Sequence, residues 1–160
     1  MKTYGILTND IIEQLKQIVS ESFVFLDEEK RTAYGKDHTE DLVFPPAVVV
    51  KPKTANEISQ IMKLANEYLI PVTPIGARTG LSGGMLSVYQ RIGVSLERMN
   101  EILNIDTDNL QVITQPGVIT QVLQDAVLEK GLFYPVDPSS KGSCFIGGNI
   151  AENSGGARAV

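Results

Sequence analysis

Two glycine-dense stretches hold the residues of this chain best suited to bind a ligand through backbone amides. The first runs from Pro74 to Gly84 and the second from Gly147 to Gly156. Glycine permits positive φ angles and lets a ligand approach the backbone without a Cβ in the way. Consecutive exposed N–H groups form a concave site for an anion such as phosphate. Because each stretch follows a strand-like segment, we expect one long phosphate-bearing ligand to be held between the two.

The two commonest phosphate-binding motifs are absent from the sequence. A Walker P-loop ends in Gly-Lys-Ser/Thr, and no such string occurs. A Rossmann motif needs Gly-x-Gly-x-x-Gly, whereas Gly76 and Gly80 are differently spaced and follow a proline. What remains is a loop whose N–H groups, with the hydroxyls of Thr79 and Ser82, could donate to phosphate oxygens. A glycine-rich surface connection without a ligand is the alternative interpretation.

Composition limits the class of protein. The chain has 160 residues, 42% of them apolar and 21% charged, which is typical of one soluble globular domain. The net charge of −5 comes with scattered Lys and Arg, which argues against a nucleic-acid partner. The single cysteine, Cys144, excludes an internal disulfide and offers no zinc site. No apolar run is long enough for a secretory signal or a membrane span, so we expect a cytoplasmic protein. We also expect no bound metal.

The first half of the chain reads as alternating helices and strands. A helix is predicted over 10–20, beginning at a capping box of Asp10 and Glu13, and a polar loop over 27–41. A buried strand follows at 47–50. Thr54 and Glu57 form a second capping box before another helix. Residues 70–75 then give the strand that leads into the first glycine stretch, which completes a parallel βαβ unit.

The second half has a different pattern. Strands are predicted over 92–96, 102–105 and 110–114, the last two paired as an antiparallel hairpin. A helix runs to Lys130, and Gly131 fits its C-terminal stop. The expected fold class is therefore α+β, with a small parallel βαβ subdomain followed by a mixed and antiparallel subdomain with flanking helices.

Several ordered motifs together resemble one known family. After the first glycine stretch come Pro-Gly-Val at 116–118, Gly-Leu at 131–132, Pro-Val-Asp-Pro-Ser-Ser at 135–140 and the second glycine stretch. This order resembles the FAD-binding domain of FAD-linked oxidases of the vanillyl-alcohol-oxidase (PCMH) type, closest to the branch of the glycolate oxidase D-subunit and D-lactate dehydrogenase. The similarity begins near Leu42. We therefore expect residues 1–41 to be an N-terminal helix and entrance segment, and 42–160 an FAD-binding domain that is incomplete at its C-terminus and lacks the cap.

The resemblance implies which residues contact FAD. Backbone amides of the first loop would carry the pyrophosphate, namely those of Ile75, Gly76, Ala77, Arg78, Thr79 and Gly80, with Ser82 close by. Pro74, at the start of the loop, is also expected to contact the cofactor. A second segment would lie along the adenosine and ribityl groups, namely Pro135, Asp137, Pro138 and Ser143. The wall beside the flavin ring would consist of the turn Gly147-Gly148-Asn149 with Asn153, Gly155 and Gly156.

Departures from the family bear on how the flavin is held. Some relatives link it covalently to a histidine near the position of Arg78, but the only histidine here is His38. Cys144 lies near, though not on, the cysteine of doubly linked relatives. We therefore expect non-covalent FAD. The Arg78 guanidinium either points at the pyrophosphate or stays solvated on the loop exterior.

Other reactive residues have ordinary interpretations. His38 is expected at the surface, since no second histidine or cysteine joins it as a metal ligand. Cys144 is expected to fill core space rather than act as a nucleophile. Tyr34 and Asp37 could hold the entrance segment. Asp137 either accepts from a sugar hydroxyl or caps a turn at Pro138.

The resemblance implies oxidation of a 2-hydroxy acid of the glycolate or D-lactate type, with hydride transfer to flavin N5. The catalytic base and the substrate ligands lie in the family's cap, so no catalytic residue is predicted and the electron acceptor stays open. We expect this chain alone to be inactive and to hold FAD weakly. The alternatives are another oxidase of the same fold group, or a non-catalytic module that binds nucleotides or anions.

Overall fold

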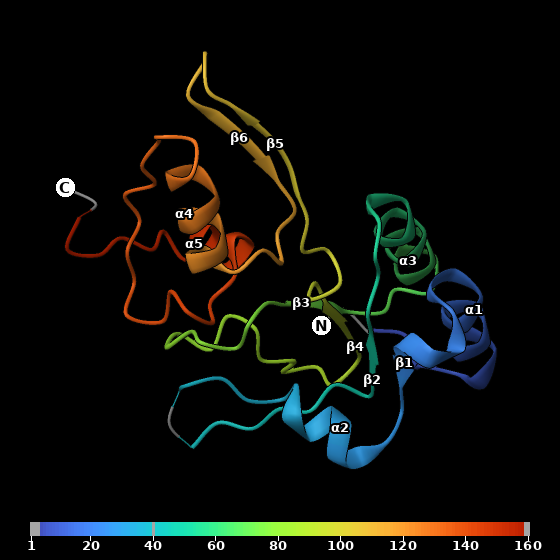
Figure 1. Cartoon of the computed structure of the whole chain (residues 1–160). Helices are drawn as coiled ribbons and strands as arrows, with labels where there is room; N and C mark the ends of the chain where they lie inside the picture. The colour runs from blue at the N-terminus through green and yellow to red at the C-terminus, as the bar shows by residue number, and fades with distance from the viewer. Residues whose placement is uncertain (1–3, 40, 159–160) are drawn as a thin grey trace. The chain divides into compact units, whose positions relative to one another are not determined.

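The computed structural model describes residues 4–39 and 41–158. These residues form two compact units, one ending at Arg98 and the other beginning at Met99. Figure 1 names the helices and strands of both, and each unit is described by itself below. Among the described residues, no helix is both long enough and apolar enough to cross a membrane.

The first unit is built on a four-stranded sheet. Its strands are β1 (Val24–Phe25), β2 (Val48–Val50), β3 (Val72–Ile75) and β4 (Ile92–Ser95), in the spatial order β1-β2-β4-β3. β2, β4 and β3 run parallel, and β1 pairs antiparallel with β2. The predicted parallel relationship of β2 and β3 is confirmed, although the two do not pair directly, because β4 lies between them.

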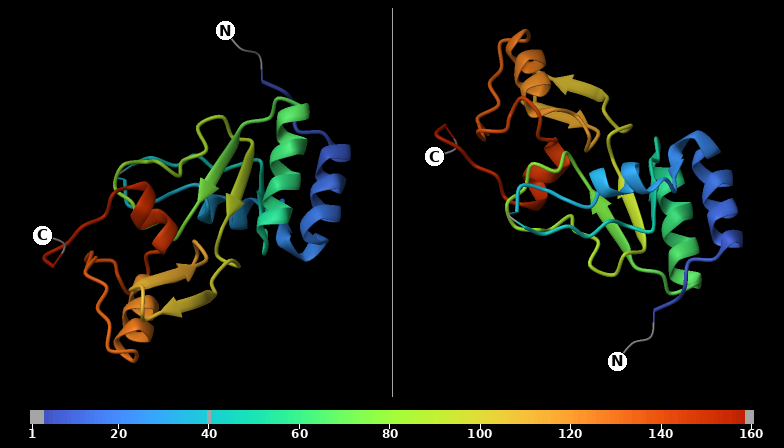
Figure 2. Two further views of the ribbon diagram at one scale, coloured as in Figure 1. Left: turned by 90° about the horizontal axis from the view of Figure 1, so that it is seen from above. Right: turned by 90° about the horizontal axis from the view of Figure 1, so that it is seen from below.

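Helices cover the sheet of the first unit. α1 (Asn9–Val19) and α3 (Ala55–Glu67) lie side by side, as Figure 2 shows from two directions. Their apolar faces share one core with alternate residues of the central strands: Ile11, Leu15, Val19, Ile61, Leu64, Ala65, Val48, Val50, Ile92 and Val94. Val49, with the opposite orientation in β2, joins a second cluster with Tyr34 and Ile75. The strand alternation thus separates two small cores.

Two local expectations for this unit are wrong. α1 is capped by the Thr8 hydroxyl, which accepts from the Ile11 N–H at 3.4 Å, rather than starting at Asp10. The stretch predicted as a polar loop contains α2 (Glu28–Ala33), capped by the Asp27 carboxylate. α2 has no buried residue, so no apolar periodicity marks it. The cap at Thr54 is confirmed, since its hydroxyl accepts from the Glu57 N–H at 3.1 Å.

The second unit combines a β-ribbon with helices. β5 (Ile102–Asp106) and β6 (Gln111–Thr114) pair antiparallel, which confirms the predicted hairpin. α4 (Thr120–Leu128) packs on the ribbon through Leu123 and Val127. The predicted stop after this helix is confirmed, because Gly131 has φ +74 and its N–H donates to the Leu128 carbonyl.

The second glycine stretch differs from its prediction. The predicted turn Gly147-Gly148-Asn149 is wrong, because these residues lie inside the short helix α5 (Ile146–Ala151). A Cβ at Gly147 would stand 2.7 Å from Pro116 Cβ, and the Gly147 N–H donates to the Pro116 carbonyl at 2.8 Å. Gly147 therefore serves close packing of α5, a role that outweighs the low helix propensity of glycine.

Candidate functional site

The loop after β3 offers a row of unused hydrogen-bond donors. Ile75, at the end of the strand, is fully buried and fixes where the loop begins. Within residues 4–39 and 41–158, the N–H groups of residues 76–80 donate to no acceptor. Ligands of open α/β sheets bind at the carboxyl ends of parallel strands, which is where this loop lies. Half-buried amides without partners are suited to an anion.

Two glycines of this loop leave space for a ligand. An added Cβ at Gly76 would meet no atom of the chain within 4 Å, and at Gly80 only the Asp37 carboxylate at 3.9 Å. Neither has the positive φ that favours glycine. A side chain at either position would therefore extend into open space beside the loop. The loop thus fits a phosphate group that lies against the backbone.

The entrance segment lies directly beside this loop. The His38 N–H donates to the Gly80 carbonyl at 3.0 Å, and the Asp37 carboxylate accepts from the Thr39 N–H at 2.8 Å. The His38 residue is exposed, as expected. Among the described residues, no group of His, Cys, Asp and Glu could hold a metal ion. The segment therefore contacts the loop through its backbone.

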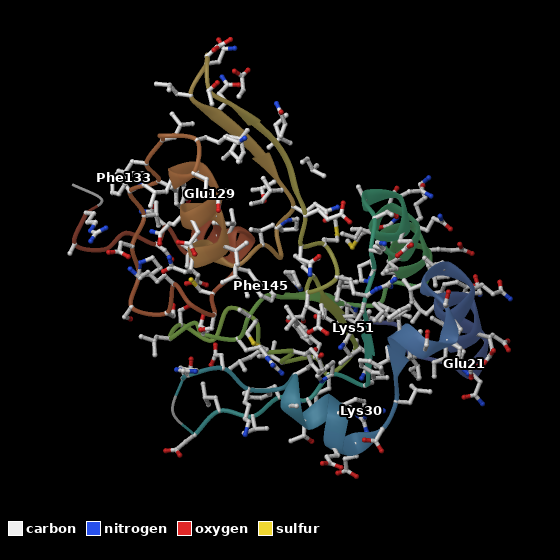
Figure 3. The ribbon with its side chains drawn as sticks, in the orientation of Figure 1. Glu21, Lys30, Lys51, Glu129, Phe133 and Phe145 are labelled. Carbon is white, nitrogen blue, oxygen red and sulfur yellow. The ribbon has the colours of Figure 1, made fainter. Side chains whose placement is uncertain are left out.

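A polar network joins the ends of two strands in the first unit. The Tyr34 hydroxyl donates to the Glu97 carboxylate at 3.0 Å, and Glu97 forms an ion pair with Lys51, labelled in Figure 3. Burial acts to raise the pKa of Glu97, but Lys51 and Tyr34 outweigh it and leave that pKa lowered. Burial acts to lower the pKa of Lys51, but Glu97 and Tyr34 leave it raised. At neutral pH both groups are charged.

Lys51 and Glu97 were missed from the sequence, although a signal was present. Lys51 directly follows β2, and Glu97 follows β4 by two residues. Because parallel strands bring their carboxyl ends to one edge, a lysine and a glutamate there are expected to meet. Burial raises the pKa of Tyr34. The Lys51 ammonium also lies 5.1 Å from the centroid of the Tyr34 ring.

The Arg78 side chain makes two contacts that the sequence did not indicate. Its guanidinium donates to the Ala33 carbonyl at 2.7 Å and lies 4.8 Å from the centroid of the Tyr34 ring. The Arg78 backbone has φ +64. A left-handed residue within a turn brings neighbouring N–H groups to one side, as in anion-binding nests.

Asp137 and the second glycine stretch meet in the second unit. The Asp137 N–H donates to the Gly155 carbonyl at 3.1 Å, and an added Cβ at Gly156 would stand 2.2 Å from the Asp137 carbonyl oxygen. The Asp137 carboxylate pairs with Lys141 at 2.7 Å and Arg158 at 3.5 Å. Lys141, which donates to the carboxylate, is the main cause that lowers the pKa of Asp137.

The remaining predicted residues of this unit fall into two groups. Gly148 and Gly155 have open space where a Cβ would be, as Gly76 does. Pro135, Ser143 and Asn153 are exposed and Pro138 is half-buried. Whether these residues face the same ligand as the first loop stays a prediction.

The Asn149 side chain lies in the interior of the second unit. Its side-chain amide is buried and donates to the Thr120 hydroxyl at 2.6 Å, which also lies 3.1 Å from the Cys144 sulfur. Thr120 was missed from the sequence, since one threonine at the start of a helix carries no pattern. Cys144 is buried, as expected of a core residue.

The first unit thus presents a loop of free amides at the end of a parallel strand, within an α+β fold. A family model described as an FAD binding domain matches residues 46–160. The chain belongs to this FAD-binding domain family, and its cofactor is FAD. The free amides and the open glycines of the first loop fit a cofactor that carries a pyrophosphate.

Curated relatives confirm the branch expected from the sequence. The chain is 38% identical over 150 residues to D-2-hydroxyglutarate dehydrogenase of Stutzerimonas stutzeri, covering 94% of this chain and 32% of that protein. It is 40% identical over 154 residues to glycolate oxidase subunit GlcD of Bacillus subtilis, covering 96% and 33%. It is 38% identical to D-lactate dehydrogenase of Anaerostipes hadrus, covering 98% and 33%. The chain thus spans 32–33% of the length of these relatives.

Solved structures confirm the fold class. An alkyldihydroxyacetonephosphate synthase matches with a TM-score of 0.85 at 20% identity, covering 98% of this chain and 31% of that one. A p-cresol methylhydroxylase matches with a TM-score of 0.61 at 19% identity, covering 78% and 25%. At these identities the likeness concerns the fold alone.

Proposed function

We propose that this chain is the N-terminal FAD-binding part of a flavin-dependent oxidoreductase that oxidises a 2-hydroxy acid of the glycolate or D-lactate type. The row of free amides at 76–80 is the observation that carries the binding role. The substrate class is supported by the relatives, which are a D-2-hydroxyglutarate dehydrogenase, a glycolate oxidase subunit and a D-lactate dehydrogenase. The 2-hydroxy acid is the small-molecule partner, and the electron acceptor is left open.

In this proposal each group of residues has a binding role. Residues 76–80 donate amide hydrogens to the pyrophosphate, and Gly76 and Gly80 leave it room. Pro135, Asp137, Pro138 and Ser143 line the adenosine and ribityl groups. Backbone at Gly148, Asn149, Asn153 and Gly155 contributes to the wall beside the ring. When bound, FAD supplies the acceptor for the substrate hydride.

The division of the chain belongs to the same proposal. Residues 42–160 form the FAD-binding portion, and residues 1–41 form an N-terminal helix and entrance segment. The base and the substrate ligands belong to a cap domain of the whole protein. FAD is held non-covalently, because Arg78 stands near the position of the linking histidine of relatives. A cytoplasmic location is proposed from the lone cysteine.

Titration of the chain with FAD and with ADP tests the binding role. We expect both to bind, FAD more tightly, and the amide resonances of residues 76–80 to shift with either. After desalting, we expect little flavin absorbance to remain, because the chain alone holds FAD weakly. Equal affinities for FAD and ADP would favour a nucleotide-binding module instead, and unshifted amides at 76–80 would contradict the assignment of the loop.

A further inference from the structure

Arg78 has a backbone conformation that is unfavourable for a residue with a side chain. Its φ of +64 lies in the left-handed region, where the Cβ crowds the following carbonyl oxygen. Glycine would take this conformation without that cost. An arginine here is therefore expected to stabilise the loop through contacts of its own side chain.

Those contacts are made with the end of α2. Ala33 is the last residue of that helix, and its carbonyl accepts from the Arg78 guanidinium at 2.7 Å. Carbonyl groups in the last turn of a helix lack helical donors and attract cations. The guanidinium also lies 4.8 Å from the Tyr34 ring centroid, within the range of a cation–π interaction.

Tyr34 is in turn held firmly. Only 8% of its surface is exposed, and its hydroxyl donates to Glu97, which is paired with Lys51. These two partners follow the central strands β4 and β2. A continuous series of contacts therefore runs from the sheet through Tyr34 to the Arg78 side chain. The His38–Gly80 backbone hydrogen bond attaches the far end of the loop to the same segment.

We propose that Arg78 is a positioning residue whose guanidinium fixes the loop through Ala33 and Tyr34 instead of binding the pyrophosphate itself. The loop amides are then held in their binding arrangement before the ligand arrives, which lowers the entropy lost on binding. The inference rests on the proposed function of the loop. It extends the binding machinery to Ala33 and Tyr34, which precede the residues matched by the family model.

The first test needs no cofactor. Order parameters of the backbone N–H groups of residues 76–80 are measured by ¹⁵N relaxation in the wild-type chain and in Arg78→Ala. We expect values of about 0.85 in the wild type and below about 0.6 in the variant. Lys63→Gln is the matched control, because it removes one positive charge from an exposed position of α3. Unchanged order parameters in Arg78→Ala would overturn the proposal.

The second test separates positioning from direct contact. We expect Arg78→Ala to weaken FAD binding roughly 5- to 30-fold, the range for losing a charged hydrogen bond and a cation–π contact. Arg78→Lys keeps the positive charge but cannot reproduce the planar contact with the Tyr34 ring and the Ala33 carbonyl, so positioning predicts a loss close to that of Arg78→Ala. A guanidinium that binds the pyrophosphate through its charge would instead leave Arg78→Lys near wild-type affinity, and that result would overturn the proposal.

Tyr34→Leu tests the inference independently, because it removes the ring that the Arg78 guanidinium contacts. We expect it to loosen the loop as Arg78→Ala does, and the double variant to bind FAD no more weakly than Arg78→Ala alone. Full additivity of the two losses would contradict the inference. Failure of the proposed function would give a different result. The amide resonances of residues 76–80 in the wild-type chain would then not shift when FAD is added.

Discussion

The Asn149 side-chain amide donates to the Thr120 hydroxyl at 2.6 Å, and both residues are buried in the second unit. This bond joins α5, which contains the glycines at 147 and 148, to the first residue of α4. The same hydroxyl contacts the Cys144 carbonyl at 3.3 Å. The orientation of α5 therefore depends on a polar contact inside an otherwise apolar core.

Thr120→Val is expected to destabilise the chain by about 1–3 kcal/mol, because it leaves the buried Asn149 amide without its acceptor. Unfolding in urea, followed by circular dichroism, measures the change. Thr120→Ser retains the hydroxyl and serves as the control, with a smaller loss. A Thr120→Val chain as stable as the wild type would show that the hydrogen bond contributes nothing to stability.

Gly76→Ala is expected to weaken FAD binding by about tenfold or more while leaving stability nearly unchanged. A methyl group there meets open space in the chain but occupies the position expected for phosphate. Gly35→Ala is the contrast within the same unit, since its Cβ would stand 2.6 Å from Pro45 backbone atoms. We expect it to lower the free energy of unfolding by about 1–3 kcal/mol. Titration and thermal unfolding of both variants check this, and an unaltered affinity in Gly76→Ala would count against phosphate at Gly76.

The stability of the first unit should depend on pH through Glu97. Because its pKa is lower in the folded state, the Glu97 carboxylate stabilises the fold above its ordinary pKa of 4.5. That contribution is lost as the pH falls through the folded-state pKa. Glu97→Gln should therefore cost about 1 kcal/mol at pH 7, between the values for surface and buried pairs, and less at pH 3.

Urea unfolding of the wild type and Glu97→Gln at both pH values measures this difference. Asp108→Asn, in the exposed turn between β5 and β6, is a control for the loss of one negative charge. If the free energies of unfolding of the wild type and Glu97→Gln differed by the same amount at pH 7 and pH 3, the charge of Glu97 would not be the cause of that difference.

Flavin bound to the chain should be released by acid precipitation. Non-covalent FAD then appears in the supernatant, whereas covalently linked flavin stays in the pellet and gives it fluorescence. We expect essentially all of the flavin in the supernatant. A fluorescent pellet would mean that a residue of this chain, such as Cys144, forms a covalent link.

The sequence revealed those parts of the fold that repeat a strong local pattern. Three consecutive valines marked β2, and turn residues between two apolar runs marked the β5–β6 hairpin. The position of β4 between β2 and β3 was not predictable, because strand order is set by long-range packing. One contact of that packing is Gly93, where a Cβ would stand 2.8 Å from Ile75 Cδ1.

Part of the candidate site could be predicted from local sequence. Glycine content marked the loop at 76–80, whose amides lack partners among the described residues. The resemblance of several ordered motifs indicated the FAD-binding family, which is confirmed. The contacts that support the loop depend on side chains far apart in sequence, such as Tyr34 with Glu97, and no local pattern encodes such a pair. The α5 helix escaped prediction for the opposite reason, since its two glycines disfavour a helix that tertiary packing nevertheless stabilises.

The placement of Pro74 has a consequence for association between molecules. β3 lies at one end of the four-stranded sheet, with β4 as its only neighbour among the described residues. A proline has no N–H to offer an incoming strand, and it is tolerated in sheets mainly at such margins. The residue that leads into the loop at 76–80 therefore also discourages a foreign chain from extending the sheet and aggregating there.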